Sequence, residues 1–567
     1  MSPTVTVVEL RVLDGPNLYF PKPAIKLTLA VPGWMRAADK TVLRTAAGLG
    51  FDRIIPGEPG TDARRRTTAR IAKQFTRRIG LAAGAERLAV RARLGGPADQ
   101  IVIAFPWRRQ GSAEALAGAV ADALASALKR SPARLVAELA ARVAAADPGE
   151  EPSVPDPTIP VIQVTGTNGK TTTVRLLAHL VRTAGLRVAY SCTDGVYRGD
   201  GELIEPGDYS GFGGAARALA EGPDIAVLET ARGGLLLRGS GVLHNDVAVV
   251  TNVSEDHLGL HGVQTLDQLA EVKAIPTRIT RPGGWDVLNA DDPRVLAMRR
   301  LAAGRPWLFS ADPGHPAFRE VLPLGGRAIT VVDGVLTWLD GHQLHPLVAV
   351  EDIPATLAGL SRVNVANAMA AAAAALGAGI PPRAVVKGLK TFVLDPERNP
   401  GRANLFQLDG RVVVVDYAHN TAGMLSLAEV MRGLCRRGHE VWLAIGTAGD
   451  RTDAILHAFS LQAALGSDHL AIAELRRYLR RRTEQDIIDR LREGAAKAGV
   501  TDVPAYPDEL EALRAMLASA HPHDVVAVTA LAKRAEIFAW LEAAGATRVT
   551  PATVRRLVRR VKEDTTT

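Results

Sequence analysis

A glycine-rich segment followed by lysine and threonine is the part of the sequence whose residue types most clearly indicate chemistry. The apolar run 161–165 leads into Gly166, Gly169, Lys170 and Thr171. A strand that enters such a loop, followed by a helix, leaves backbone N–H groups free to bind phosphate oxygens. The lysine can then neutralise a transferred phosphate, and the threonine hydroxyl can ligate Mg²⁺. The segment therefore predicts a nucleotide-binding loop.

The loop is shorter than the usual phosphate-binding pattern. That pattern has a glycine five residues before Gly169, where this chain has Val164. The alternative is a tight turn between a strand and a helix that carries a solvated lysine. We favour nucleotide binding because the loop lies between an expected strand and an expected helix. The residues expected to contact the nucleotide here are Gly166, Thr167, Asn168, Gly169, Lys170, Thr171 and Thr172.

Three further polar side chains follow expected strands or lie on an expected helix. Glu229 follows the run 225–228, and ligands of open α/β sheets bind at that end of a strand. A carboxylate beside a triphosphate suits Mg²⁺, although a surface or helix-capping glutamate is the alternative. His257 also follows an apolar run, but Mg²⁺ prefers oxygen ligands, so its type fits a structural role equally well. From its position alone, Lys273 is typical of a solvated helix face.

Short apolar runs that alternate with helical stretches predict the elements that position these residues. This alternation is typical of parallel sheets covered by helices. Before it, residues 4–13 predict a strand and the alanine-rich residues 112–146 predict a helix. The expected strands after residue 158 are 160–164, 187–190, 225–228, 247–250, 411–415, 441–445, 469–473 and 525–529.

Proline-rich breaks predict the domain organisation. We expect an α+β domain over residues 1–145, a linker over 146–158, a central P-loop ATPase domain over 159–397 and a C-terminal Rossmann-like α/β domain over 398–567. The length of 567 residues agrees with about three or four domains.

Composition excludes several classes of protein. With 47% apolar and 23% charged residues, the chain is typical of a globular protein, and its two cysteines exclude a disulfide framework. No secretory signal or membrane span is evident, so we expect a cytoplasmic protein. The net charge of +8 suits an anionic substrate or nucleotide. The basic runs 476–482 and 555–562 are more typical of solvated helix faces than of a nucleic-acid site, although an acidic polymer could also bind there.

Several motifs in order resemble those of the Mur ligases. Residues 166–172 are similar to the ATP loop of Mur ligases and folylpolyglutamate synthetases, which are ATP-dependent amide-forming enzymes. The resemblance extends over residues 158–567 and is most specific to the Mur-ligase half of cyanophycin synthetases. Residues 11–17 are more weakly similar to the small first domain of the same enzymes. The motifs that carry the specific resemblance are residues 193–200, 205–208, 228–234, 256–260 and 288–293.

One domain of cyanophycin synthetases is missing from this chain. They carry an ATP-grasp domain where this sequence has only the linker 146–158. The resemblance implies that the missing domain adds aspartate to a backbone, while the Mur half adds arginine to its side chain. We therefore expect this chain to perform at most the second kind of step, with a separate ATP-grasp ligase as a candidate partner.

The resemblance also implies roles for single residues. His257 would hold a second Mg²⁺, and Lys273 matches a lysine that is carbamylated in many relatives and then binds metal. Arg402 would stabilise phosphate charge at the hinge into the third domain, and Asp416 would contact the ribose or nucleotide. Asn367 would contact adenine. From the residues alone, Asn364 and Asn367 share a helix face, and N-capping by Asn364 is the alternative explanation.

These observations predict an ATP-dependent acid–amino-acid ligase that uses ATP and Mg²⁺ and works through an acyl phosphate. The substrates would be a carboxylate-bearing peptide or polymer and an amine or amino acid, without nucleic acid, and a homo-oligomer is a further candidate state. The alternatives are a non-catalytic polymer-binding or scaffold subunit and a folylpolyglutamate-synthetase-like ligase. The expected catalytic residues are Lys170, Glu229, His257, Lys273 and Arg402, and the expected metal ligands are Thr171, Glu229, His257 and Lys273.

Overall fold

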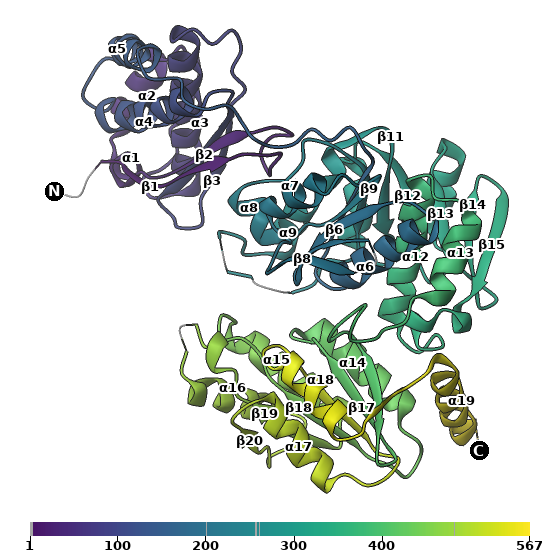
Figure 1. The fold of residues 1–567 in the computed structure, drawn as a ribbon. Helices are drawn as coiled ribbons and strands as arrows, with labels where there is room; N and C mark the ends of the chain where they lie inside the picture. The colour runs from purple at the N-terminus through teal and green to yellow at the C-terminus, as the bar shows by residue number, and fades with distance from the viewer. Residues whose placement is uncertain (1–3, 200, 256–257, 260, 481, 567) are drawn as a thin grey trace.

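The described residues form three sheets, one after another along the sequence (Figure 1). The computed structural model describes residues 4–199, 201–255, 258–259, 261–480 and 482–566. His257, an expected metal ligand, lies outside the described residues. Within these ranges, no helix has both the length and the apolar character needed to cross a membrane.

The N-terminal part is an antiparallel four-stranded sheet with helices packed on it. Its strand order is β1-β2-β4-β3. The alanine-rich segment forms two helices, α4 and α5, rather than the single helix expected over residues 112–146, because Pro132 begins a new helix. The elements are β1 (Thr6–Leu13), β2 (Ala24–Ala30), α1 (Pro32–Arg36), α2 (Asp39–Gly48), α3 (Asp62–Ala82), β3 (Arg91–Leu94), β4 (Gln100–Pro106), α4 (Gln110–Ser126) and α5 (Pro132–Ala144).

The central part is built on an eleven-stranded mixed sheet. Its order is β15-β14-β13-β12-β11-β10-β5-β9-β6-β7-β8, and the strands from β13 to β6 in this order pair in parallel. The strands are β5 (Val161–Thr165), β6 (Val188–Cys192), β7 (Gly195–Arg198), β8 (Glu202–Pro206), β9 (Ile225–Glu229), β10 (Asn245–Val250), β11 (Thr280–Asn289), β12 (Arg305–Phe309), β13 (Arg327–Val332), β14 (Val335–Asp340) and β15 (Gln343–Ala349). The helices are α6 (Lys170–Thr183), α7 (Phe212–Ala220), α8 (Arg232–Leu237), α9 (Leu266–Lys273), α10 (Pro293–Ala297), α11 (Pro316–Val321), α12 (Arg362–Gly377) and α13 (Pro382–Thr391).

The C-terminal part has a seven-stranded sheet of order β20-β19-β18-β21-β17-β16-β22, parallel from β20 to β17. Its strands are β16 (Asn404–Leu408), β17 (Arg411–Asp416), β18 (Val441–Ile445), β19 (His469–Ala473), β20 (Ala505–Tyr506), β21 (Val525–Thr529) and β22 (Thr547–Arg548). Its helices are α14 (Thr421–Leu434), α15 (Asp453–Gly466), α16 (Glu484–Ala496), α17 (Glu509–Ser519), α18 (Arg534–Ala543) and α19 (Pro551–Thr566). The expected α/β class, with two largely parallel sheets behind a smaller α+β part, is confirmed.

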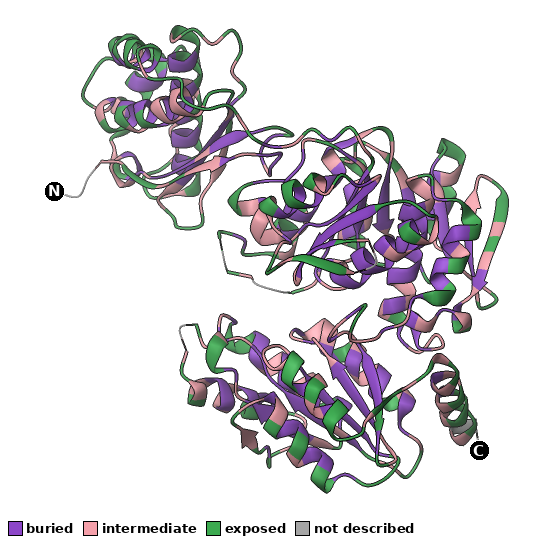
Figure 2. Ribbon diagram, viewed as in Figure 1, coloured by how far each residue is buried: buried purple, intermediate pink, exposed green. Residues whose placement is uncertain are grey.

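The core of the central part explains why an alanine-rich helix lies in its middle. Helix α12 is apolar on nearly all sides and packs against α6 and against strands β10, β11 and β12 of the sheet, with residues 368–375 buried (Figure 2). A helix that is apolar all round is stable only when it is buried. Its small side chains allow α6, which begins at the phosphate loop, to pack closely against it.

Candidate active site

The predicted nucleotide loop is a sharp turn between β5 and α6. Gly169 has a left-handed backbone with φ +86° and precedes the first residue of α6, Lys170. A Cβ at Gly169 would lie 2.2 Å from Asn367 Oδ1, and a Cβ at Gly166 would lie 1.8 Å from Thr251 Oγ1. Both positions therefore require glycine, for reasons of packing as well as backbone conformation. The first N–H groups of α6 have no partner within the helix, so they can donate to an anion.

A segment after β10 holds the loop in this shape. The Thr167 N–H donates to the Asn252 carbonyl oxygen, and the Asn168 N–H donates to Asn252 Oδ1, both at 2.9 Å. The Thr251 hydroxyl donates to the Asn168 carbonyl oxygen at 2.6 Å. Sequence analysis did not single out Thr251 or Asn252, because their role depends on contacts more than 80 residues away along the chain.

Lys170 is half-buried and donates from Nζ to the Thr167 carbonyl oxygen at 2.8 Å. The lysine lines a cavity, which fits a phosphate-binding role better than the alternative of a solvated lysine at a turn.

Glu229 lies at the end of β9, beside the phosphate loop. Its side chain is 2% exposed, and its carboxylate accepts hydrogen bonds from the hydroxyls of Thr171 and Thr193, both at 2.9 Å. The alternative of a surface or helix-capping glutamate is therefore wrong. Thr193 belongs to a motif of the resemblance, but its contact with Glu229 was not foreseen.

Lys273, the last residue of α9, is buried rather than on a solvated helix face. Its ammonium group donates to the Gly166 carbonyl oxygen, and the residue lines the same cavity as Lys170 and Glu229. The solvated-face interpretation of Lys273 is therefore wrong. Its burial results from packing of α9, which the capping box at Thr265 begins.

The polar groups here suit a hydrated Mg²⁺ held jointly with a nucleotide. One carboxylate and two hydroxyls converge at Glu229. Mg²⁺ favours one or two carboxylates together with phosphates and water. Among the described residues no group of three or more His, Cys, Asp and Glu side chains could hold a metal alone, so phosphate oxygens would have to complete the ligand set.

Asn367 lies on α12 beside the phosphate loop. Its side-chain amide donates to Asn364 Oδ1 at 3.0 Å, and both residues line the cavity. The N-cap of α12 is Ser361, whose hydroxyl accepts the Asn364 N–H, so the alternative of N-capping by Asn364 is wrong. The adenine contact of Asn367 stays a prediction.

Arg402 lies in the segment 392–403 that connects α13 to β16, called the hinge below, and Asp416 lies at the end of β17. The Arg402 guanidinium stacks over the Tyr417 ring at 4.0 Å from its centroid. The Asp416 carboxylate accepts the backbone N–H groups of Ala403 and Ala418 at 2.7 and 2.8 Å. Burial raises the pKa of Asp416, against the opposing effects of Arg402 and these N–H groups. Both side chains line the cavity, and the backbone bonds of Asp416 also fix the hinge.

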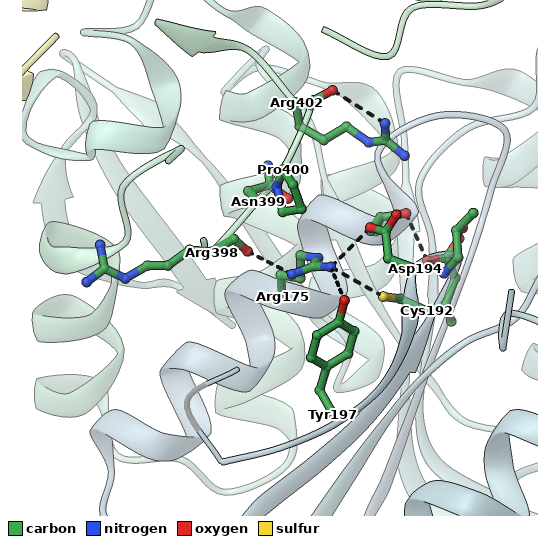
Figure 3. Close-up of polar contacts among 12 residues, drawn as sticks. Arg175, Cys192, Asp194, Tyr197, Arg398, Asn399, Pro400 and Arg402 are labelled. Carbon is green, nitrogen blue, oxygen red and sulfur yellow. Dashed lines mark hydrogen bonds and ion pairs between the residues drawn. The ribbon is translucent and has the colours of Figure 1, made fainter. Parts of the chain in front are cut away.

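A buried arginine joins the hinge to the central sheet (Figure 3). Arg175 on α6 donates to the Arg398 carbonyl oxygen at 3.1 Å and to Asp194 Oδ2 at 3.0 Å. Asp194 also accepts a bond from Arg534 on α18 at 2.9 Å. Burial opposes ionisation of Asp194, but Arg534, Arg402 and Arg175 outweigh it and hold its pKa below the usual value. Sequence analysis missed this network, which links residues up to 340 positions apart.

The phosphate loop also meets the C-terminal part directly. The side-chain amides of Asn168 and Asn420 exchange two hydrogen bonds, of 3.2 and 3.0 Å. Asn420 is in addition the N-cap of α14. The phosphate loop is thus in contact with the start of α14 in this structure.

A cavity of about 960 Å³ is lined by residues of the phosphate loop, by Glu229 and Lys273, and by Asn367, Arg402 and Asp416. Tyr478 and Arg480 line it, so the basic run 476–482 is not the solvated helix expected from sequence: residues Arg476–Tyr478 form a short 3₁₀ helix, and Arg480 has a left-handed backbone. Among the described residues, the charged side chains on its wall are Lys170, Arg232, Arg238, Lys273, Arg402, Arg451 and Arg480 against Asp208, Glu229, Asp416 and Asp450.

Comparison with known proteins identifies the family. The Mur ligase middle domain matches residues 164–375, and the Mur ligase glutamate ligase domain matches residues 401–531. The UDP-N-acetylmuramyl-tripeptide synthetase of Deinococcus radiodurans is 30% identical over 408 residues, which are 69% of this chain and 78% of that protein. The chain belongs to the Mur ligase family. The expected family is therefore confirmed, and its known members are ATP-dependent ligases that form carbon–nitrogen bonds.

Two further relatives define how far this likeness extends. The cyanophycin synthetase of Geminocystis herdmanii is 39% identical over 317 residues, 56% of this chain. The chain spans only 36% of the length of that enzyme. The solved folylpolyglutamate synthase/dihydrofolate synthase of Yersinia pestis, complexed with AMPPNP and a Mn ion, covers 68% of this chain and 89% of its own. Its TM-score of 0.50 at 19% identity shows a shared fold.

Proposed function

We propose that this Mur ligase family member joins a carboxylate of a peptide or polymer to an amine through an acyl phosphate formed with ATP. One observation carries the proposal: a single cavity brings the phosphate loop, Glu229 and Lys273 together with Arg402 from the hinge. The proposal keeps the domain bounds predicted from the sequence, with the N-terminal domain ending at residue 145, the linker at 158 and the central domain at 397.

The residues of the cavity have separate roles in the proposed reaction. The substrate carboxylate attacks the γ-phosphorus, and the β–γ bond breaks to release ADP. Lys170 and Arg402 neutralise charge on the transferred phosphate, because positioning and electrostatics dominate phosphoryl transfer. Glu229, Thr171 and Lys273 would hold Mg²⁺, with Lys273 as its carbamate, and the metal would supply charge neutralisation. Asn367 and Asp416 would bind the nucleoside.

The amine then attacks the carbonyl carbon of the acyl phosphate, and inorganic phosphate leaves with the bonding electron pair. The amine must lose a proton in this step, and water or a phosphate oxygen can accept it. The excess of basic side chains on the cavity wall favours an acid substrate that carries several carboxylates. An aspartyl peptide with arginine or lysine as the amine fits that preference. A separate ATP-grasp ligase would supply the peptide backbone.

The test is amine-dependent ADP release. We would incubate the protein with ATP, Mg²⁺ and a panel of aspartyl peptides and basic amino acids, and identify joined products by mass spectrometry. Release that requires both acid and amine supports the proposal, whereas ATP binding without turnover across the panel contradicts these substrates. A protein that fails to bind ATP would instead be a scaffold.

Lys170→Ala should lower the rate of ADP release by at least about 10²-fold, because it removes a charge opposite the transferred phosphate. Lys129→Ala is the matched control, since Lys129 is exposed on the N-terminal part and does not line the cavity. Full activity in Lys170→Ala would overturn the assignment of the loop.

A further inference from the structure

One buried side chain holds the turn between β1 and β2 in shape. Asn17 is buried at its centre, and its amide donates to the carbonyl oxygens of Gly15 and Lys22, both at 2.9 Å. Its Oδ1 accepts the backbone N–H groups of Tyr19 and Phe20 at 3.0 and 3.1 Å. All the hydrogen bonds of one side chain therefore serve to fix the shape of this turn.

The turn packs backbone to backbone against the segment that follows α8 of the central part. The Gly15 N–H donates to the Arg238 carbonyl oxygen at 3.1 Å, and the Ser240 N–H donates to the Pro16 carbonyl oxygen at 2.6 Å. A Cβ at Gly15 would lie 1.9 Å from the Ser240 carbonyl oxygen, and one at Gly239 would lie 2.5 Å from the Gly15 carbonyl oxygen. The two segments fit together only because both positions are glycine.

This contact sets the position of one arginine on the cavity wall. Arg238 Nε donates to Asp14 Oδ2 at 2.6 Å, and the guanidinium stacks on the Phe212 ring at 4.5 Å from its centroid. The Asp14 side chain is 13% exposed, whereas that of Arg238 is 54% exposed. The two terminal nitrogens of Arg238 make no hydrogen bond to any part of the chain that the structure describes.

An arginine held in this way is suited to bind an anion. Asp14 holds the guanidinium at Nε, and the Phe212 ring covers one of its faces. The two terminal nitrogens remain, and they can pair with both oxygens of a carboxylate. ATP phosphate already has the loop N–H groups and Lys170. A free arginine or lysine carries two cationic groups against one carboxylate, so its net charge is positive and the basic wall repels it overall. The acid substrate, with several carboxylates, is the reactant other than ATP whose net charge Arg238 attracts.

We propose that Arg238 binds a carboxylate of the acid substrate other than the one that is activated, and that Asp14 is the positioning residue that aims it. The proposal rests on the proposed function, because it assumes an acid substrate in this cavity. It assigns the N-terminal part a role in substrate recognition, although no described residue of that part lines the cavity. An acid with a single carboxylate would gain no binding affinity from Arg238, because it has no second carboxylate to pair with the guanidinium.

Steady-state kinetics with the full chain can test this assignment. Arg238→Gln should raise KM for an aspartyl peptide by about 10- to 100-fold, because a charge-assisted bidentate pair is lost. KM for ATP should change by less than about twofold. Arg238→Lys should have an intermediate effect, since lysine keeps the charge but not the fork. Asp14→Asn should raise the same KM, and its effect should be non-additive with Arg238→Gln, because Asp14 acts through Arg238.

A second ion pair between the same two parts provides the matched control. Arg93 on β3 pairs with Glu271 on α9 at 2.6 Å, and neither residue lines the cavity. Glu271→Gln should leave both KM values unchanged. If Arg238→Gln and Asp14→Asn raise KM for ATP and for the peptide equally, or raise neither, the assignment of Arg238 is wrong.

A binding measurement separates failure of this assignment from failure of the proposed reaction. If the wild type releases no ADP with any acid, fluorescence anisotropy with a labelled tetra-aspartate peptide still reports on Arg238. Binding that weakens at least about tenfold in Arg238→Gln, and not in Glu271→Gln, would support the carboxylate site while the reaction is rejected. Equal affinity in wild type and Arg238→Gln would overturn the site.

Discussion

The central part meets its two neighbours through different chemistry. At the N-terminal junction, backbone packs on backbone: Gly15 fits against Ser240, and two main-chain hydrogen bonds cross between the segments. Two ion pairs, Asp14 with Arg238 and Arg93 with Glu271, add to this contact. At the C-terminal junction the contacts come mainly from side chains: the amide pair of Asn168 with Asn420, and the ion pair of Asp194 with Arg534.

This difference indicates which junction can move. Side-chain amides and ions can exchange their partners for water when two surfaces separate, at a modest net cost for each bond. Two backbone segments that fit closely against each other cannot exchange their contacts for water one at a time, so the whole contact must open at once. We therefore expect the N-terminal junction to stay closed during turnover, and the C-terminal junction to open and close around the nucleotide. Three substitutions test the comparison.

Asp194→Ala should have the largest effect. It leaves Arg175, whose side chain is 2% exposed, without its ionic partner, and removing one member of a buried pair costs about 3–5 kcal/mol. Thermal unfolding should show this as a lower midpoint. Arg534→Ala is the control: it keeps the pair of Arg175 with Asp194, and Arg534 is 26% exposed, so its effect should be smaller. Equal midpoints for wild type and Asp194→Ala would show that the buried guanidinium of Arg175 does not need this ionic partner.

Gly15→Ala should have an intermediate effect on stability. The added methyl group has no space beside the Ser240 carbonyl oxygen, and such overpacking costs about 1–3 kcal/mol. Limited proteolysis of the segment between the N-terminal and central parts would detect the opened junction. Gly96→Ala, at an open position of the same part, should leave the digestion pattern unchanged. A stable, protease-resistant Gly15→Ala protein would contradict a close backbone fit.

Asn168→Ala should have the smallest effect, and it should appear in turnover. The substitution removes both hydrogen bonds to Asn420, which together contribute about 1 kcal/mol net to the closed arrangement. If turnover requires that arrangement, kcat should fall roughly fivefold. Asn420→Asp should cost less, because aspartate still accepts from Asn168 and still caps α14. An unchanged kcat in Asn168→Ala would separate this amide pair from domain closure.

Local patterns in the sequence predict the elements around the phosphate loop well. The strands β18, β19 and β21 have the bounds expected from their apolar runs, and Lys170 begins the helix expected there. Glu229 could be placed beside the loop because the ends of neighbouring parallel strands meet at one edge. Such inferences need only short-range periodicity and the rules of parallel sheets.

The junctions could not be predicted in this way. The contact of Asp14 with Arg238 spans 224 residues, and that of Asp194 with Arg534 spans 340. No periodicity relates such residues, so their pairing follows only from how the three sheets pack. The resemblance of residues 11–17 to a known domain marked the turn, but it gave no partner for Asp14. The run 476–482 was predicted wrongly because its charge pattern suits a helix, whereas Tyr478 and Arg480 are turned toward the cavity.

The two glycines of the phosphate loop have a thermodynamic consequence. Thr251 and Asn367 already occupy the space beside Gly166 and Gly169, so the protein itself determines the shape of the loop. A nucleotide would therefore bind to a backbone that is ordered beforehand, and binding would require little loss of backbone conformational entropy. In calorimetry, nucleotide association should then lack the large unfavourable entropy that accompanies the folding of a loop around its ligand.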